Sequence, residues 1–134
     1  MTELTEESAV LAFARAWNRL EPEVFLELLG PDARYASQWV FEELVGVSAI
    51  SDYLRSKMRT VRANAANDQS LRVRVEVGRT GHGSYDRPCA FMTQGKGEDV
   101  QAAVVFKVCD DRISRYDLCI PQIVGATRTG LFPI

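Results

Sequence analysis

The sequence predicts a single α+β domain in which a strongly curved mixed or antiparallel sheet wraps round a long helix like a cone, with two further helices at the N-terminus. Three observations predict this fold class. Apolar residues recur at helical spacing in two N-terminal segments, recur again in one long central segment, and alternate with polar residues in the second half. Because 134 residues suffice for one hydrophobic core, residues 1–134 are assigned to one domain, with its core over 6–120 and a tail over 121–134.

Two helices are expected before residue 32. The first covers residues 6–19, with Thr5 as its N-cap. Its apolar stripe is Val10, Phe13, Ala14 and Trp17. The second helix is short, with Pro22 at its first position and Gly30 as its terminator. Its apolar face consists of Val24, Phe25, Leu28 and Leu29.

Gly46 separates a strand pattern from a helix pattern. Residues 32–45 are rich in aromatic and β-branched residues and predict a pair of strands. The helix that follows has Ser48 as its cap and ends in the small polar run 63–69. Its apolar residues are Ile50, Tyr53, Leu54, Met58 and Val61.

The second half predicts a four-stranded antiparallel meander over residues 71–77, 87–94, 100–109 and 112–120. In the first of these strands, apolar residues alternate with Arg72, Arg74 and Glu76, so one face is expected to meet solvent. Glycine-containing segments at 78–86 and 95–97 are expected to be the first two connections. The tail has apolar anchors at Ile123, Val124, Leu131, Phe132 and Ile134.

The register of the last strands follows if Asp110-Asp111 forms a two-residue hairpin turn. Cys109 then pairs with Arg112, and Val104 lies opposite Asp117. On this register one face, taken as the concave one, carries the candidate pocket residues Cys89, Phe91, Val104, Phe106, Arg115, Asp117 and Cys119. A shift of one residue would reverse the two faces, because side chains alternate along a strand.

Asp117 is the candidate catalytic residue. Between Val104, Cys89 and Cys119 its carboxyl group would be partly desolvated, which raises its pKa towards values useful for acid–base chemistry. The alternative interpretation is an ion pair with Arg115 near the rim of the sheet, without a catalytic role.

Trp17 on the first helix and three residues on one face of the first strand are further pocket candidates. The strand residues are Tyr35, Ser37 and Trp39. The aromatic side chains of this set also suit a protein core, which is the alternative interpretation. His82, the one histidine, lies between two glycines and is expected in a solvated loop.

Two motifs carry a resemblance to a known family. Pro-Asp-Ala-Arg-Tyr at 31–35 opens the first strand, and Gly46 is followed by Ile-Ser-Asp-Tyr-Leu at 50–54. Together with the order of elements over 6–120, these motifs resemble the nuclear transport factor 2-like superfamily, whose members include ketosteroid isomerase, limonene epoxide hydrolase and the SnoaL-like polyketide cyclases. The resemblance implies a cystatin-like cone. Relatives often dimerise through the sheet, so a homodimer is expected.

The resemblance extends to catalytic residues only in part. Tyr116-Asp117 resembles the placement of the acid on the last strand of limonene epoxide hydrolase, but residues 104–106 are apolar where that hydrolase has an arginine and an aspartate. The three polar groups of the ketosteroid isomerase mechanism fall at Phe13, Ser37 and Val104. The isomerase mechanism is therefore not expected, and this chain lacks part of the residues that the hydrolase mechanism needs.

The remaining sequence features argue against several partners. The three cysteines, Cys89, Cys109 and Cys119, lack Cys-x-x-Cys spacing and are expected to be small buried residues. The sequence contains no cluster of metal ligands and no nucleotide-binding motif, so no metal or cofactor is expected. Basic residues gather over 55–79 without a nucleic-acid motif, so no nucleic acid is expected. No apolar run approaches the roughly 18 residues of a membrane helix, and the acidic N-terminus does not resemble a signal peptide, so a cytoplasmic protein without a membrane partner is expected.

Two hypotheses follow for function. The first is a domain with an apolar pocket that binds a small apolar or amphipathic organic ligand, with Asp117 as the polar anchor or as the acid–base group of a cofactor-independent isomerase, cyclase or dehydratase. The alternative is a non-catalytic dimerisation or partner-binding module whose cone is filled by side chains. A pocket of roughly 300 Å³ or more that reaches Asp117 would favour the first.

Overall fold

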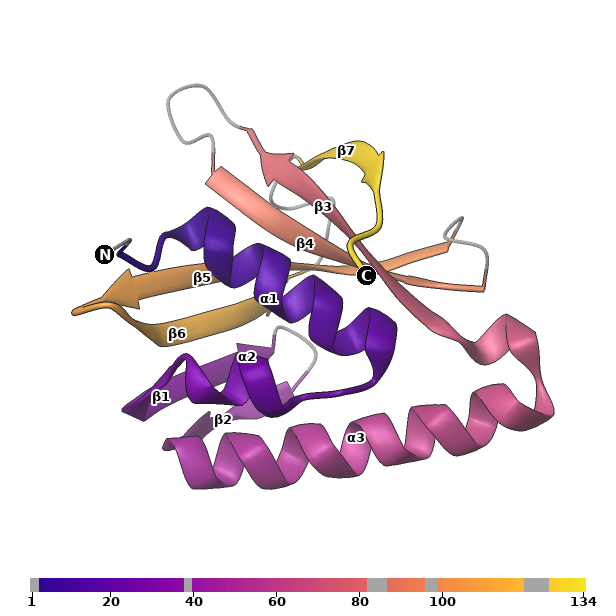
Figure 1. The fold of residues 1–134 in the computed structure, drawn as a ribbon, viewed down its shortest axis with the longest axis horizontal. Helices are drawn as coiled ribbons and strands as arrows, with labels where there is room; N and C mark the ends of the chain where they lie inside the picture. The colour runs from indigo at the N-terminus through magenta and orange to yellow at the C-terminus, as the bar shows by residue number, and fades with distance from the viewer. Residues whose placement is uncertain (1–2, 38–39, 82–86, 96–98, 120–125) are drawn as a thin grey trace.

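A curved mixed sheet packs against two of the helices in the computed structural model, which describes residues 3–37, 40–81, 87–95, 99–119 and 126–134 (Figure 1). Within these residues the sheet has seven strands in the order β2-β1-β6-β5-β4-β3-β7. Strand β1 runs parallel to β6, and the other neighbouring pairs are antiparallel. The α+β fold class is confirmed.

The elements follow the chain in the expected order up to the tail. The helices are α1 (Glu6–Arg19), α2 (Glu23–Glu27) and α3 (Val47–Asn67), with a short 3₁₀ turn at Gln69–Leu71. The strands are β1 (Leu29–Ser37), β2 (Val40–Val45), β3 (Val73–Thr80), β4 (Arg87–Gln94), β5 (Asp99–Cys109), β6 (Arg112–Cys119) and β7 (Ala126–Leu131). Helix α1 packs across β3, β4 and β5, whereas α3 lies along β1 and β2.

Helix α1 forms as predicted, because its signals are local. The hydroxyl of Thr5 accepts a hydrogen bond from the backbone N–H of Ser8 and caps the helix. The four residues of the predicted apolar stripe are all buried, together with two alanines. The core cluster beneath the helix is aromatic: the ring of Phe13 lies 5.3 Å from those of Phe25 and Phe106.

The ends of the other two helices differ from prediction. Helix α2 ends at Glu27, and Gly30, the predicted terminator, lies inside β1. The reason is pairing with β6: the backbone N–H of Ile113 donates to the carbonyl of Leu28, so the strand begins at once. Val24, predicted on the apolar face, is 69% exposed.

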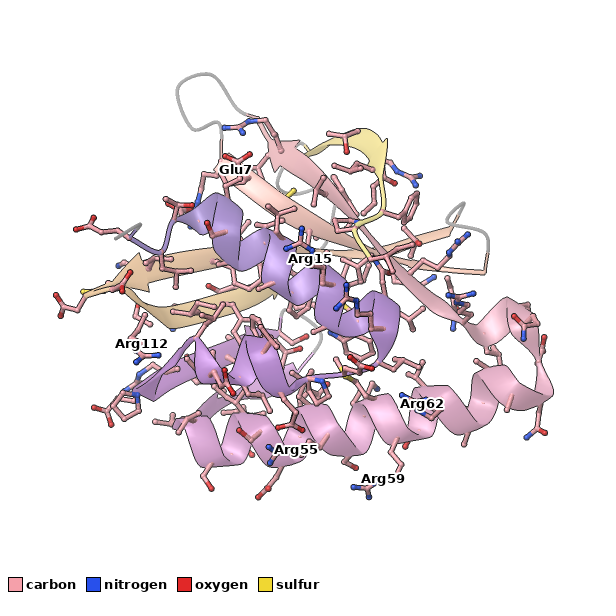
Figure 2. The ribbon with its side chains drawn as sticks, in the orientation of Figure 1. Glu7, Arg15, Arg55, Arg59, Arg62 and Arg112 are labelled. Carbon is pink, nitrogen blue, oxygen red and sulfur yellow. The ribbon has the colours of Figure 1, made fainter. Side chains whose placement is uncertain are left out.

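Gly46, not Ser48, is the N-cap residue of α3, and Ser48 lies within the helix. The φ of Gly46 is +96°, a conformation that glycine adopts without strain. Three of the predicted apolar residues are buried: Ile50, Leu54 and Met58. The exposed side of the helix carries Arg55, Arg59 and Arg62 (Figure 2).

Strand β7 is a strand that the sequence analysis missed, and it changes the environment of β3. The tail pairs antiparallel with β3, which itself continues through residues 78–80 of the predicted loop. Glu76, predicted on the solvent face, is 1% exposed because residues of β7 cover it. The guanidinium of Arg128 donates to Oε1 of Glu76 over 2.9 and 2.6 Å, and the N–H of Gly130 donates to Oε2 over 2.6 Å.

Two of the predicted tail anchors are exposed, and several predicted loop and tail residues are not described by the structure. Leu131 and Ile134 are exposed, so they do not anchor the tail. His82, Lys96, Gly97, Ile123 and Val124 lie outside the described residues.

One bulge decides which residues of β6 face the core. The turn at Asp110-Asp111 forms as predicted, with φ values of 52° and 63°, and Cys109 pairs with Arg112. Pairing then passes from Val108–Ile113 to Lys107–Arg115, which leaves Ser114 as an extra residue. The predicted register was therefore wrong by one residue from this point.

The corrected register exchanges the two faces of β6. Asp117 lies opposite Val105 instead of Val104, and Cys119 lies opposite Ala103. Val104 of β5 pairs with Ala90 of β4. Tyr116 and Leu118 thus face the helices, where the core cluster lies. Arg115, Asp117 and Cys119 lie on the outer face of the sheet.

Candidate functional site

The concave side of the sheet and the two long helices enclose a cavity of about 60 Å³, here called the cone cavity. Its lining residues come from α1, α3 and four strands: Phe13, Trp17, Tyr35, Tyr53, Leu54, Lys57, Met92, Val104, Tyr116 and Leu118. Ordinary ligand pockets start at about 300 Å³. The aromatic side chains of the core therefore fill most of the cone.

The polar ends of the lining residues are placed by the regular geometry of their elements. Tyr53 and Lys57 are four residues apart on α3 and so project from one helix face. Tyr35 on β1 is the direct neighbour of Tyr116 on β6, and their rings stack with centroids 4.5 Å apart. The ring of Tyr53 lies 5.6 Å from that of Tyr35. A row of three phenols thus borders the cavity.

Two buried polar atoms of the cavity lining have no hydrogen-bond partner within the described residues. They are Nε1 of Trp17 and the hydroxyl oxygen of Tyr116. Leaving a polar group buried and unpaired costs about 1–3 kcal/mol, so such atoms are rare in native proteins. Both residues line the same cavity. A bound molecule with a hydrogen-bond acceptor would satisfy them.

Burial also fixes the protonation of two of the phenols. Desolvation raises the pKa of Tyr116 well above its usual value, and the neighbouring tyrosines raise it further. The pKa of Tyr35 is raised mainly by burial as well. Both groups therefore keep their protons at neutral pH and act as neutral hydrogen-bond donors.

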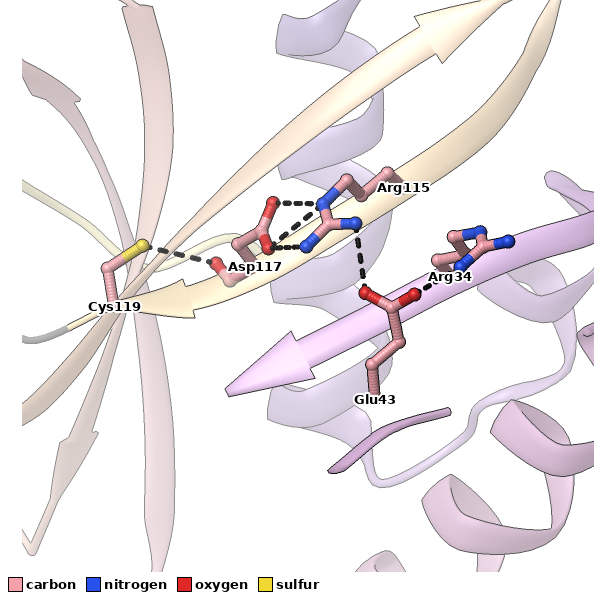
Figure 3. A network of polar contacts seen from close by, with 5 residues as sticks. All are labelled: Arg34, Glu43, Arg115, Asp117 and Cys119. Carbon is pink, nitrogen blue, oxygen red and sulfur yellow. Dashed lines mark hydrogen bonds and ion pairs between the residues drawn. The ribbon is translucent and has the colours of Figure 1, made fainter. Parts of the chain in front are cut away.

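Asp117 lies on the outer face and does not line the cone cavity. The guanidinium of Arg115 donates to both of its carboxylate oxygens, at 2.8 to 3.1 Å (Figure 3). Arg115 also donates to Glu43 over 3.0 Å, and Glu43 pairs with Arg34. Hydrogen bonds from Arg34 and then Arg115 hold the pKa of Glu43 below its usual value. The alternative interpretation of Asp117, an ion pair with Arg115, is thus the observed arrangement.

The predicted pocket residues separate into several places. Trp17, Tyr35 and Val104 line the cone cavity. Ser37, Arg115, Asp117 and Cys119 line an outer hollow of about 360 Å³ instead. Cys89 and Phe91 form a separate buried cluster with Ala103. Phe106 is buried in the main core, and Trp39 lies outside the described residues.

Several lining residues were not predicted from the sequence, and of these Tyr53, Lys57 and Tyr116 carry polar groups. Tyr53 and Lys57 could have been found from their four-residue spacing on one helix face. Tyr116 could not have been found without the bulge at Ser114, because the predicted register placed it on the opposite face.

Two of the three cysteines are buried and are expected to be unreactive in the folded protein. Burial raises the pKa of the Cys89 thiol to about 12 and also raises that of Cys119, so little of the reactive thiolate forms at pH 8. Cys109, predicted to be buried, is exposed. Brief iodoacetamide treatment at pH 8 should add one group, at Cys109, and treatment in urea should add three. Peptide mass spectrometry that found Cys89 modified as fast as Cys109 in the native protein would contradict this.

Comparison with known proteins identifies the family. The model of the SnoaL-like domain matches residues 10–116, so the chain belongs to the SnoaL-like domain family and has the nuclear transport factor 2-like fold. No curated protein matches the chain.

Three solved structures illustrate the likeness in fold. A nuclear transport factor 2-like protein of unknown function from Cytophaga hutchinsonii is 13% identical, with 91% of this chain and 96% of that chain covered and a TM-score of 0.57. A putative polyketide cyclase from Sinorhizobium meliloti is 16% identical, with 82% and 92% covered and a TM-score of 0.54. An epoxide hydrolase from M. tuberculosis, described as LEH-like, is 22% identical, with 90% and 85% covered and a TM-score of 0.55.

Neither a membrane-spanning helix nor a cluster of metal ligands occurs among the described residues. None of their helices has the length and apolar composition that crossing a membrane requires. Within the same residues, no group of three or more histidine, cysteine, aspartate or glutamate side chains is placed to hold a metal ion.

Proposed function

We propose that this protein binds a small organic molecule whose apolar part enters the cone cavity and whose acceptor group meets Trp17 and Tyr116. The observation that carries the proposal is the pair of buried, unpartnered polar atoms on two residues that line the same cavity. The surrounding side chains, such as Phe13, Leu54 and Val104, suit an apolar group. Two structural neighbours have names that refer to organic substrates, a polyketide cyclase and an epoxide hydrolase, which supports the same class of ligand.

The small volume of the cavity restricts the ligand. At about 60 Å³ it accepts a small group, and the remainder of a longer molecule would extend through the opening beside Tyr53 and Lys57, which are both exposed. The described lining residues include neither a carboxylate nor a histidine, and burial raises the pKa of the Tyr35 and Tyr116 phenols away from neutrality, so we propose binding without a proton-transfer step. Asp117 is not part of this proposal, because it lies on the other face of the sheet.

A second candidate is the non-catalytic partner-binding module. The filled cone, in which Phe13, Phe106 and Tyr116 pack ring against ring, favours it. The apolar residues Tyr116, Leu118 and Met92 do not offer a partner surface on the outer side of the sheet, because they border the cone cavity. A homodimer and a cytoplasmic location stay predictions, and analytical ultracentrifugation would test the first.

The indole N–H of Trp17 offers a direct test by ¹⁵N NMR. The chain has two tryptophans, and a Trp39→Phe variant assigns the two indole signals. Titration with small amphipathic compounds should shift the Trp17 signal. Tyr116→Phe should weaken binding about 5- to 10-fold, since one hydrogen bond contributes about 1 kcal/mol. If no compound moves the Trp17 signal, the proposed function is wrong.

A further inference from the structure

The polar groups that line the cone cavity are of one kind. They are the indole N–H of Trp17, the phenols of Tyr35, Tyr53 and Tyr116, and the ammonium group of Lys57. Every one of them can donate a hydrogen bond, and no described residue of the lining carries a negative charge. The cavity lining therefore offers several donors to an acceptor group of a ligand, and the one charged side chain among its described residues, Lys57, is positive.

Lys57 is the charged member of this set, and it has no described partner. Two arginines of the same helix are engaged: Arg55 with Glu23 at 2.8 Å, and Arg62 with the carbonyl of Leu20 at 3.0 Å. For Lys57, by contrast, the described part of the chain supplies neither an ion pair nor a hydrogen bond. An exposed, unpaired cation thus stands at the opening of an apolar cavity.

We infer that the ligand is an organic carboxylate whose carboxylate lies against Lys57 at the opening, while an acceptor group further along the molecule meets Trp17 and Tyr116. This inference rests on the proposed function of the same cavity. The cavity holds only a small group, so the carboxylate of an inserted chain stays at the opening, where it retains much of its hydration. There the ammonium group of Lys57 attracts it and would repel the ammonium group of an amine.

The experiment compares three probes of equal chain length: pentanoate, pentanamide and pentylamine. Their dissociation constants are measured from the Trp17 indole signal at low salt in the wild type, in Lys57→Gln and in Arg59→Gln. Arg59 is the matched control, because it is exposed on the same helix, two residues away, and does not line the cavity. All three proteins are expected to fold, since both substitutions are on the exposed helix surface.

The wild type and Arg59→Gln should bind pentanoate about fivefold more tightly than pentanamide, as expected for one exposed ion pair. Lys57→Gln should remove this preference, and 0.5 M salt should reduce it in the wild type. Three results would overturn the inference while leaving the binding function in place. They are equal binding of pentanoate and pentanamide by the wild type, a preference for pentanoate that survives in Lys57→Gln, and tighter binding of pentylamine than of pentanoate. If none of the three probes moves the Trp17 signal, the proposed function and this inference both fail.

Discussion

Replacing Phe25 by alanine should lower the free energy of unfolding by about 3–5 kcal/mol. Phe25 is fully buried, and its ring centroid lies 5.3 Å from that of Phe13, 5.5 Å from that of Tyr116 and 6.1 Å from that of Phe106. The substitution leaves a cavity between three rings that cannot easily close. Since domains of this size are stable by about 5–15 kcal/mol, urea denaturation should show a much lower midpoint.

The neighbouring residue on the same helix provides the control for this prediction. Val24 is 69% exposed, so Val24→Ala should change the free energy of unfolding by no more than about 0.5 kcal/mol. Helix α2 has only five residues and is too short to be stable alone, so it depends on the packing of Phe25 and Leu26. Equal losses in the Phe25 and Val24 variants would show that the burial of Phe25 does not determine the stability of this segment.

Elements specified by local signals could be predicted from the sequence, and α1 is the clearest case. Its cap, its stripe and its last residue depend on neighbours within four positions. The end of α2 could not be predicted, although Gly30 and Pro31 are typical helix terminators. Pairing of Leu29 with Ile113, far away in the sequence, draws the chain into β1 before Gly30 is reached.

For the candidate site, an error of one residue in strand register has a larger effect than an error in the bounds of a helix or strand. Because side chains alternate along a strand, the extra residue Ser114 moves Asp117 from the expected pocket to the outer face. No sequence feature near Ser114 distinguishes a bulge from a regular strand. Trp17 and Tyr35 line the cone cavity, and both belong to elements that precede the bulge in the chain.

Glu76 illustrates a second limit of sequence patterns. The alternation over residues 71–77 predicts that Glu76 is exposed to solvent, as Arg72 is, just before β3 begins. The burial of Glu76 depends on β7, a strand 50 residues later with few apolar residues. A polar tail segment such as Ala126–Leu131 has little strand signal of its own, so its pairing partner on β3 becomes visible only in the folded chain.

Arg128→Met should destabilise the protein by about 3 kcal/mol, because it leaves the carboxylate of Glu76 buried without its cation. The methionine retains most of the length of the side chain, so the lost charge dominates the effect. The double variant Glu76→Gln/Arg128→Met should be more stable than Arg128→Met alone, since an amide carries no charge to desolvate. Arg59→Met, on the exposed side of α3, is the matched control and should shift the urea midpoint little. A midpoint for Arg128→Met equal to that of this control would mean that β7 does not hold the Glu76 carboxylate in solution.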